Sequence, residues 1–274
     1  MAEGTTSRVS LTLESTVASV NAVEEAALEY ACAAGFSLDI AGHLSMVAGE
    51  ATANAVIHGN KYDPAKHIVA TFEITDSALT IKVADQGEGV DPESIPDPLA
   101  PENLLRASGR GVFLMRTFMD EVQFRRLNPG TEISLIKRRI VPDRQTSNIP
   151  NGSVEERLTM SMKFTTRVVD GITILDLSGR ITLGEGSVTL RDAVKDVLSK
   201  GSKNILLNLA DVNYIDSSGL GELVSAYTSV KNQGGELKLL HLTTKVHDLL
   251  QITKLYTVFD IKDDETSAVG SFAR

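Results

Sequence analysis

Apolar and polar residues alternate along three segments in the first part of the chain, as they do in half-buried strands. These segments run from Arg8 to Leu13, from Lys66 to Thr75 and from Leu79 to Ala84. Between the first and second strands the apolar residues recur every three or four positions, which predicts helices from about Val17 to Ala34 and from Leu38 to His58. This part of the chain is therefore predicted to combine helices with a sheet.

Glycines mark the predicted ends of both helices. Gly35 follows the first helix, and Gly59 follows the second and is expected to adopt the left-handed conformation that closes a helix. The single cysteine, Cys32, is interpreted as a small core residue of the first helix. One cysteine can form neither an intrachain disulfide nor a zinc site built on two or more cysteines.

A proline-rich segment and three further elements follow. Residues 90–107 contain four prolines and show no periodicity, so this segment is either a functional lid or disordered. An apolar helix with the sequence VFLMRTFM comes next. Predicted strands from Val122 to Arg126 and from Glu132 to Lys137 are joined by the turn Asn128-Pro129-Gly130.

The composition of the chain changes at Ile140. Residues 141–157 contain two prolines, several turn-forming residues and charges of both signs, without apolar periodicity. We interpret them as a linker between a domain of residues 1–140 and a domain of residues 158–274, each long enough to bury its own core.

The hydrophobic pattern restarts after this linker. A hairpin centred on Asp170-Gly171 is predicted from Met160 to Val169 and from Gly171 to Leu177. Strands and helices then alternate, which is typical of a small α/β domain around a mixed sheet. The predicted helices and strands are Ser187 to Ser199, Asn204 to Leu209, Gly219 to Asn232, Glu236 to Leu242 and Thr244 to Ile252.

Composition narrows the range of functions. With 42% hydrophobic and 23% charged residues, the chain has the make-up of an ordinary soluble protein. No apolar run is long enough to span a bilayer and the N-terminus lacks the regions of a signal peptide, so we expect a cytoplasmic protein that uses no membrane. The net charge of −9 argues against direct nucleic-acid binding, which uses clustered lysine and arginine.

The segment EATANAVIHGN, residues 50–60, carries the first candidate chemistry. Glu50, Asn54 and His58 recur every four residues and therefore share one helix face. Mg²⁺ prefers oxygen ligands, so the amide of Asn54 is a candidate metal ligand. One turn earlier, Glu50 is placed to accept a proton from an attacking hydroxyl or water. Taken alone, the pattern also fits an amphipathic helix whose polar face meets water.

Two glycine-rich segments carry the remaining candidate binding residues. Asp85 ends a predicted strand, where its carboxylate suits an exocyclic amine such as that of adenine, and Gly87 and Gly89 would let the backbone approach a flat ring. A plain tight turn is the alternative. Gly109 and Gly111 precede the apolar helix. There, either free backbone N–H groups and the helix dipole bind phosphate, or the glycines are merely structural.

In this order the three motifs resemble the asparagine box and the two glycine boxes of the ATP-binding superfamily of gyrase, heat-shock chaperones, histidine kinases and mismatch-repair ATPases. The phrases EATANAVIHGN and SGRGVFLMRTFMDEV are similar to those of the anti-sigma-factor serine kinases, and the resemblance covers residues 9–138. It implies that the N-terminal domain is a two-layer α/β sandwich of the Bergerat, or GHKL, type.

The resemblance also implies roles for individual residues. Asn54 would bind Mg²⁺, Asp85 would bind the adenine amine of ATP, and Glu50 would be the general base for the acceptor hydroxyl. The glycines that would shape the nucleotide loops are Gly87, Gly89, Gly109 and Gly111.

Three further residues, near the motifs in the sequence, have two possible roles each. Arg110, between the last two glycines, either reaches phosphate or faces solvent, and Arg106 has the same two possibilities. His58 either contacts a phosphate or is a satisfied histidine at a helix end.

Residues 158–260 resemble the STAS fold of anti-anti-sigma factors, a small domain with a mixed sheet. The stretch NYIDSSGLG, from Asn213 to Gly221, matches the family motif whose serine is phosphorylated by those same kinases. The resemblance places the phosphoacceptor at Ser217, with Ser218 as the alternative. We also expect Ser217 to be the N-cap of the helix that follows.

The two resemblances together imply an ATP- and Mg²⁺-dependent protein serine kinase of the anti-sigma type, fused to a STAS phosphoacceptor and acting in partner-switching control of transcription. The expected partners are ATP or ADP, a STAS-domain protein in cis or in trans, and a sigma factor, with a homodimer formed through the N-terminal sheet. The alternative is a nonenzymatic switch in which ATP or ADP merely sets the lid conformation. A sensor histidine kinase is disfavoured because no helical hairpin with a phosphoacceptor histidine precedes the ATP module, and an anion-transporter STAS module because membrane spans are absent.

Overall fold

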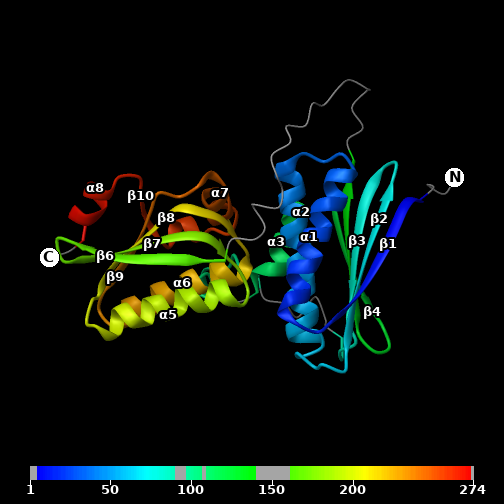
Figure 1. Ribbon diagram of the computed structural model, residues 1–274, viewed down its shortest axis with the longest axis horizontal. Helices are drawn as coiled ribbons and strands as arrows, with labels where there is room; N and C mark the ends of the chain where they lie inside the picture. Colours follow the sequence, from blue (N-terminus) through cyan, green and yellow to red (C-terminus); the bar gives the residue numbers. More distant parts are fainter. Residues whose placement is uncertain (1–4, 90–96, 107–108, 140–160, 273–274) are drawn as a thin grey trace, which may run out of the picture. The chain divides into compact units, whose positions relative to one another are not determined.

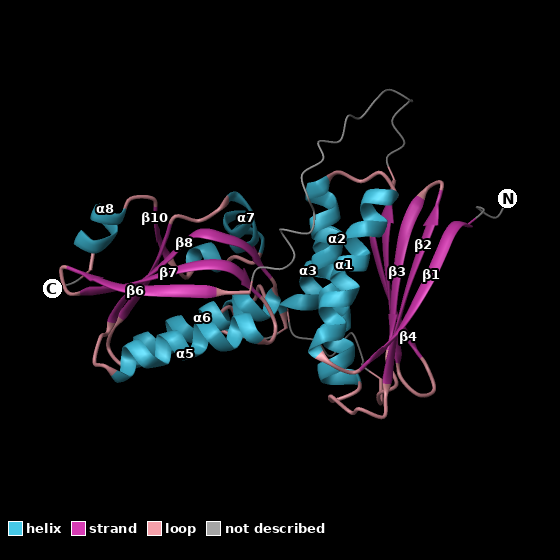
Figure 2. Cartoon of the chain, viewed as in Figure 1, coloured by secondary structure: helices cyan, strands magenta, loops and turns pink. Residues whose placement is uncertain are grey.

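The computed structural model describes residues 5–89, 97–106, 109–139 and 161–272. The predicted linker, residues 141–157, lies outside these ranges, as does part of the proline-rich segment. The chain folds into two compact units, one built mainly from residues 5–89 and 111–139 and the other mainly from residues 161–272 (Figure 1). In each unit, helices cover a sheet (Figure 2).

The N-terminal unit contains a five-stranded antiparallel sheet in the order β1-β2-β3-β5-β4. All five predicted strands are present, with ends shifted by a few residues. Buried Leu79, Ile81 and Val83 alternate with more exposed positions, as the period of a strand requires. The strands are β1 Thr5–Glu14, β2 His67–Thr75, β3 Ala78–Ala84, β4 Glu121–Arg126 and β5 Thr131–Arg138.

Three helices cover one face of this sheet: α1 (Val17–Ala33), α2 (Leu38–Asn54) and α3 (Arg110–Phe118) (Figure 1). The core lies between the two layers, where the ring of Tyr30 stacks on that of Phe72 with centroids 4.9 Å apart. The predicted positions of all three helices are confirmed, apart from the C-terminal end of α2.

The end of α2 differs from the prediction. The helix runs to Asn54 and continues as a single π-helical turn, η1 (Ala55–Gly59), in which the N–H of Asn60 donates to the carbonyl of Ala55 at 2.7 Å. Gly59 does not adopt the left-handed conformation; Lys61 and Tyr62 do, with φ of 57° and 59°. The prediction for Gly59 is therefore wrong, and its lack of a side chain serves packing instead.

The other face of the N-terminal sheet carries polar pairs between neighbouring strands. Glu73 of β2 forms ion pairs with Arg8 of β1 at 3.2 Å and with Lys82 of β3 at 2.9 Å. The hydroxyls of Ser10 and Thr71 lie 2.9 Å apart and share a hydrogen bond. Because successive side chains of a strand point to opposite faces, this face is largely polar while the covered face is apolar. We call it the helix-free face, since no helix of the described residues covers it.

The C-terminal unit contains a five-stranded mixed sheet in the order β10-β9-β8-β7-β6. Strand β6 is antiparallel to β7, and the remaining neighbours are parallel. The predicted hairpin turn is confirmed, because Asp170 and Gly171 have φ of 49° and 83°. The strands are β6 Lys163–Val169, β7 Ile172–Ile181, β8 Asn204–Ile215, β9 Glu236–Leu240 and β10 Asp260–Lys262.

Helices cover both faces of this second sheet. In Figure 1, α5 and α6 lie along one face and the short α8 lies on the other. On the α8 side, Ile174, Leu206 and Leu240 form a core cluster with Phe272. The helices are α5 Glu185–Ser199, α6 Ser217–Asn232, α7 Thr244–Ile252 and α8 Glu265–Gly270, and single 3₁₀ turns are η3 Pro101–Asn103 and η4 Leu255–Thr257.

The sequence pattern missed three features of this unit. Strand β8 continues past Leu209 to Ile215, because exposed Ala210, Asp211 and Asn213 interrupt the apolar run without ending the strand. Strand β10 and helix α8 are too short to produce a periodic signal. Across the described residues, no helix combines the length and the apolar character needed to cross a bilayer.

Two glycines of α2 provide a matched test of how tightly α1 and α2 pack. A Cβ on Gly42 would meet no described atom within 4 Å, whereas a Cβ on Gly49 would lie 2.5 Å from Oε1 of the buried Glu24. We expect Gly42→Ala to stabilise the N-terminal unit by about 0.5–1 kcal/mol, because alanine favours helix. Gly49→Ala should destabilise it by about 1–3 kcal/mol through overpacking.

The measurement is amide hydrogen exchange of α1 and α2 in the intact chain, which reports the free energy of opening of this unit alone. Equal changes in protection for the two variants would contradict the close packing at Gly49.

Candidate functional site

The structure brings together the predicted acid and amide of α2. Glu50 is only 5% exposed, and Asn54, one turn later, is partly exposed. Both face the start of α3, because a Cβ on Gly111 would lie 2.5 Å from Oε2 of Glu50 and 3.7 Å from Nδ2 of Asn54. Any side chain at Gly111 would therefore displace the Glu50 carboxylate.

Asp85 follows β3 and is held in place by backbone groups. Its Oδ1 accepts hydrogen bonds from the N–H of Gly87 at 2.7 Å and of Thr131 at 3.2 Å, and its own N–H donates to the carbonyl of Thr131 at 2.9 Å. Burial raises the pKa of Asp85, while these bonds and the charge of Lys66 oppose the rise. Among the described residues both bonds use Oδ1, which leaves Oδ2 for a donor such as an exocyclic amine.

Backbone segments close tightly around Asp85. A Cβ on Gly59 would lie 2.5 Å from Cγ of Asp85, and a Cβ on Gly87 would overlap the carbonyl oxygen of Gly59. On the other side, a Cβ on Gly130 would overlap the carbonyl oxygen of Asp85. Gly89 is different, because its φ of 89° rather than its surroundings favours glycine.

Asn60 is a residue of this site that the sequence analysis missed. It is completely buried; its Nδ2 donates to the carbonyl of His67 at 3.1 Å, and its Oδ1 accepts from the N–H of Gln86 at 2.8 Å. Gln86 in turn accepts from the N–H of His67 at 2.8 Å. The Asn60 amide thus ties the end of the helix to β2 and to the turn after Asp85. Thr131, also buried and also missed, secures the same turn from β5.

Arg110 does not face solvent, which corrects one of its two sequence-based interpretations. Its side chain is 1% exposed and donates to the carbonyls of Arg106 and, at 2.6 Å, of Leu104. Burial lowers the pKa of its guanidinium, and among the described residues its buried Nε has no hydrogen-bond partner. Arg110 therefore anchors the segment before α3, and a contact with phosphate stays a prediction.

The remaining residues of the predicted nucleotide loops are placed as follows. Gly109 has a φ of 96°, a conformation that favours glycine directly before α3. His58 and Arg106 are both exposed. Residues 90–96 and 107 of the predicted lid lie outside the described residues, as does Ser108 of the glycine-rich segment.

The predicted phosphoacceptor lies at the other end of the chain, at the start of α6. Asp216, and not Ser217, is the N-cap: its Oδ1 accepts from the N–H of Gly219 at 2.7 Å and its Oδ2 from the N–H of Leu183 at 2.8 Å. The prediction of Ser217 as N-cap is therefore wrong. Ser217 is the first helical residue and is partly exposed, as is Ser218.

Charged side chains lie near the start of α6. Asp216 is 6% exposed, and burial raises its pKa, although the nearby charge of Arg180 opposes the rise. The guanidinium of Arg180 lies 4.0 Å from the ring centroid of Tyr214. One turn into α6, Glu222 pairs with Arg191 at 2.6 Å.

The donor set near α2 suits magnesium held partly by a nucleotide. Among the described residues no cluster of three or more histidine, cysteine, aspartate or glutamate side chains could hold a metal ion alone. Mg²⁺ is commonly bound by one or two protein oxygens together with phosphates and water. The amide of Asn54, beside the carboxylate of Glu50, fits that mode of binding.

Two family models match this chain. The histidine kinase-like ATPase domain matches residues 13–137, and the STAS domain matches residues 163–268. The first match contains all the N-terminal candidate residues, and the second contains Asp216 and Ser217.

The named relatives are of two kinds, anti-sigma factors or serine-protein kinases and anti-sigma factor antagonists. An anti-sigma F factor from Anoxybacillus flavithermus is 35% identical over 37% of this chain and 71% of its own length. The serine-protein kinase RsbW of Staphylococcus epidermidis is 36% identical over 38% of this chain and 69% of its own. An anti-sigma-B factor antagonist from Bacillus subtilis is 36% identical over 32% of this chain and 78% of its own.

The two matched regions contain Glu50 and Asn54 of α2, the glycine-rich start of α3 and the serine motif at the start of α6. The chain therefore belongs to the family of anti-sigma factors and serine-protein kinases with a histidine kinase-like ATPase domain, to which it joins a STAS domain of the anti-sigma factor antagonist type.

Proposed function

We propose that this protein is an ATP- and Mg²⁺-dependent protein serine kinase of the anti-sigma type, fused to a STAS module that it or a related kinase phosphorylates. The observation that carries the proposal is the position of Glu50 and Asn54 against Gly111, where an acid and a metal ligand meet the glycine-rich start of a helix. That arrangement suits transfer of a phosphoryl group better than binding alone, because a nucleotide switch needs no buried acid beside the metal.

In the proposed reaction, the acceptor serine oxygen attacks the terminal phosphorus of ATP. An oxygen–phosphorus bond forms as the bond to the bridging oxygen of ADP breaks, and Glu50 takes the proton of the serine hydroxyl. Asn54 would hold Mg²⁺, which supplies positive charge to neutralise the phosphates when bound. The N–H groups at the start of α3, after Gly109, would bind phosphate oxygens.

At the other end of the nucleotide, Asp85 would select adenine. Its carboxylate accepts the exocyclic amine of adenine, whereas guanine presents a carbonyl oxygen at the same position. Gly87 and Gly89 would let the backbone approach the base, and Asn60 and Thr131 would keep the carboxylate in position.

Ser217 is the proposed phosphoacceptor of the STAS module. Asp216 occupies the cap position, so phosphorylation of Ser217 leaves the cap of α6 in place. A phosphate adds about two negative charges and lies favourably near a helix N-terminus. The folded module should therefore tolerate it, while a partner that docks on this surface would be repelled.

The partners would be those of a partner-switching system: a STAS protein in cis or in trans, and a sigma factor bound by the kinase unit. We propose an isologous homodimer through the N-terminal sheet as the assembly. Whether the sigma factor is released would depend on which STAS domain is phosphorylated, that of this chain or that of a separate STAS protein.

Replacing the proposed base tests the chemistry. Glu50→Gln keeps the size of the side chain but cannot accept the proton, so we expect phosphotransfer to fall about 100-fold or more with ATP affinity little changed. Transfer is measured with labelled ATP and affinity by calorimetry. The matched control is Glu25→Gln, a change to an exposed glutamate of α1. A Glu50→Gln protein as active as the control would exclude Glu50 as the base.

Replacing the proposed metal ligand tests the cofactor. Asn54→Ala removes the amide oxygen, and we expect the gain in ATP affinity that Mg²⁺ provides to be lost. Calorimetric titrations with ATP, in excess Mg²⁺ and in a chelator, measure that gain. Asn232→Ala, at an exposed asparagine of α6, is the control. The assignment fails if Asn54→Ala keeps the full difference between the two conditions.

Replacing each serine locates the acceptor. After incubation with ATP, mass spectrometry should find phosphate on the Ser217 peptide of the wild type and of Ser218→Ala, and none on Ser217→Ala. Mixing a Ser217→Ala chain, which keeps the kinase site, with a Glu50→Gln chain, which keeps the serine, reveals transfer between chains. Phosphate on Ser218 alone would move the assignment by one residue.

A further inference from the structure

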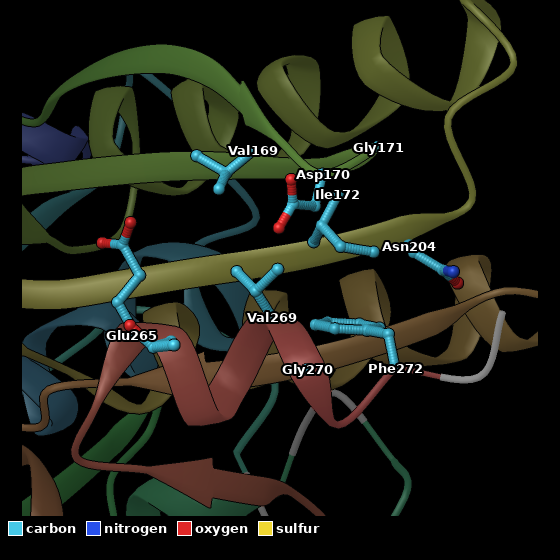
Figure 3. Close-up of a pocket in the computed structure, with 10 residues that line it drawn as sticks. Val169, Asp170, Gly171, Ile172, Asn204, Glu265, Val269, Gly270 and Phe272 are labelled. Atoms are coloured by element: carbon cyan, nitrogen blue, oxygen red, sulfur yellow. The ribbon is translucent and has the colours of Figure 1, made fainter.

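The C-terminal unit contains a pocket that the proposed kinase chemistry does not use (Figure 3). It has a volume of about 450 Å³, within the range typical of sites for small molecules. The pocket lies between the β6–β7 turn and α8, beside Asn204, the first residue of β8. Strand β8 has 12 residues and therefore separates the pocket from Ser217 by roughly 35 Å.

The inner part of the pocket is apolar. Val269 and Phe272 extend from α8 and its end toward the β6–β7 hairpin, where Val169 and Ile172 meet them (Figure 3). Ile172 and Phe272 belong to the core cluster on this side of the sheet, so the floor of the pocket is part of a packed core. A rigid apolar floor favours a ligand with an apolar body.

Acidic groups line the polar part. Asp170 and Glu265 both line the pocket, as does Asn204, and the carboxylate of Asp170 points toward the side chains of α8, whereas the side chain of Asn204 points away from it (Figure 3). Of the described residues around the pocket, none that lines it is lysine, arginine or histidine. An anionic ligand would therefore meet like charge without a compensating cation.

Basic residues lie near the pocket: Arg167 and Lys238 are paired with carboxylates, and His241 is close enough for its charge to act on Glu265. Arg167 binds Glu265 and Asp176, each at 2.6 Å, so this cluster of one cation and two carboxylates keeps one net negative charge. Lys238, whose Nζ lies 4.6 Å from the ring centroid of Phe272, pairs with Asp260 at 3.1 Å. Among the described residues Asp170 has no ion-pair partner, so its carboxylate adds a negative charge to the pocket.

We propose that this pocket binds a small organic cation, in which an ammonium group is joined to an apolar body of about ten non-hydrogen atoms. The ammonium group lies beside the carboxylate of Asp170, where charge-assisted hydrogen bonds form. Glu265 contributes negative charge from the other side, although both of its carboxylate oxygens accept hydrogen bonds from Arg167. The apolar body packs on Ile172, Val269 and the ring of Phe272.

The probe for the experiment is 2-phenylethylamine, and its matched opposite is phenylacetate, which has the same ring and a carboxylate in place of the amine. Binding to the full chain is followed by amide chemical shifts, without nucleotide, so the result does not depend on the kinase activity. We expect the amine to bind in the millimolar range, shifting residues 169–172 and 266–272, and phenylacetate to bind at least about tenfold more weakly.

Two variants and one control identify the site. A Cβ on Gly270 would meet no described atom within 4 Å, so Gly270→Leu should fold and fill the space, reducing amine binding about tenfold or more. Asp170→Asn removes one charge and should weaken binding about threefold to fivefold. Asp192→Asn, at an exposed carboxylate of α5, should leave it unchanged.

Three results would overturn the proposal: equal binding of the amine and of phenylacetate, unchanged binding to Gly270→Leu, or amine-induced shifts confined to other parts of the chain. Thermal unfolding of Gly270→Leu, expected to match the wild type, separates a filled pocket from a damaged fold.

Discussion

Two buried carboxylates, Glu50 and Asp85, are held against backbone positions that have no room for a β-carbon, and the proposed kinase site depends on this constraint. Gly111 lies against the first carboxylate, and Gly59 lies against the second. An acid buried in this way is desolvated, so its position and its hydrogen bonds decide its chemistry. Gly87 and Gly111 of the sequence motifs are therefore packing requirements of the site, whereas Gly89 and Gly109 are favoured by their positive φ.

The periodic parts of this fold could be predicted from the sequence, because helix and strand periods depend on local order. Strands β2 and β3 and helix α7 begin and end within one residue of their predicted bounds. Parts that depend on distant contacts could not be predicted. A glycine is needed at position 59 because Asp85, which is distant in the sequence, packs against it. The sequence around Gly59 does not distinguish this packing role from that of a glycine that closes a helix.

The same distinction applies to the site residues. Glu50, Asn54 and Asp85 stand in motifs whose spacing indicates their chemistry, and the structure places the first two side by side. Asn60 looks like an ordinary turn residue, and only the fold shows that its buried amide joins three segments. Asp216 was overlooked as a cap beside Ser217, although its carboxylate can accept two backbone hydrogen bonds at once and does so.

The ion pairs of Arg8, Glu73 and Lys82 have a consequence for assembly across the helix-free face of the first sheet. A protein that covers this face must either preserve these pairs or replace them, since stripping water from an unmatched charge is costly. An interface on this face would retain water molecules and would fix the orientation of the partner. Raising the ionic strength would weaken it by screening the charges. The same charges disfavour nonspecific association of the sheet with the sheets of other molecules.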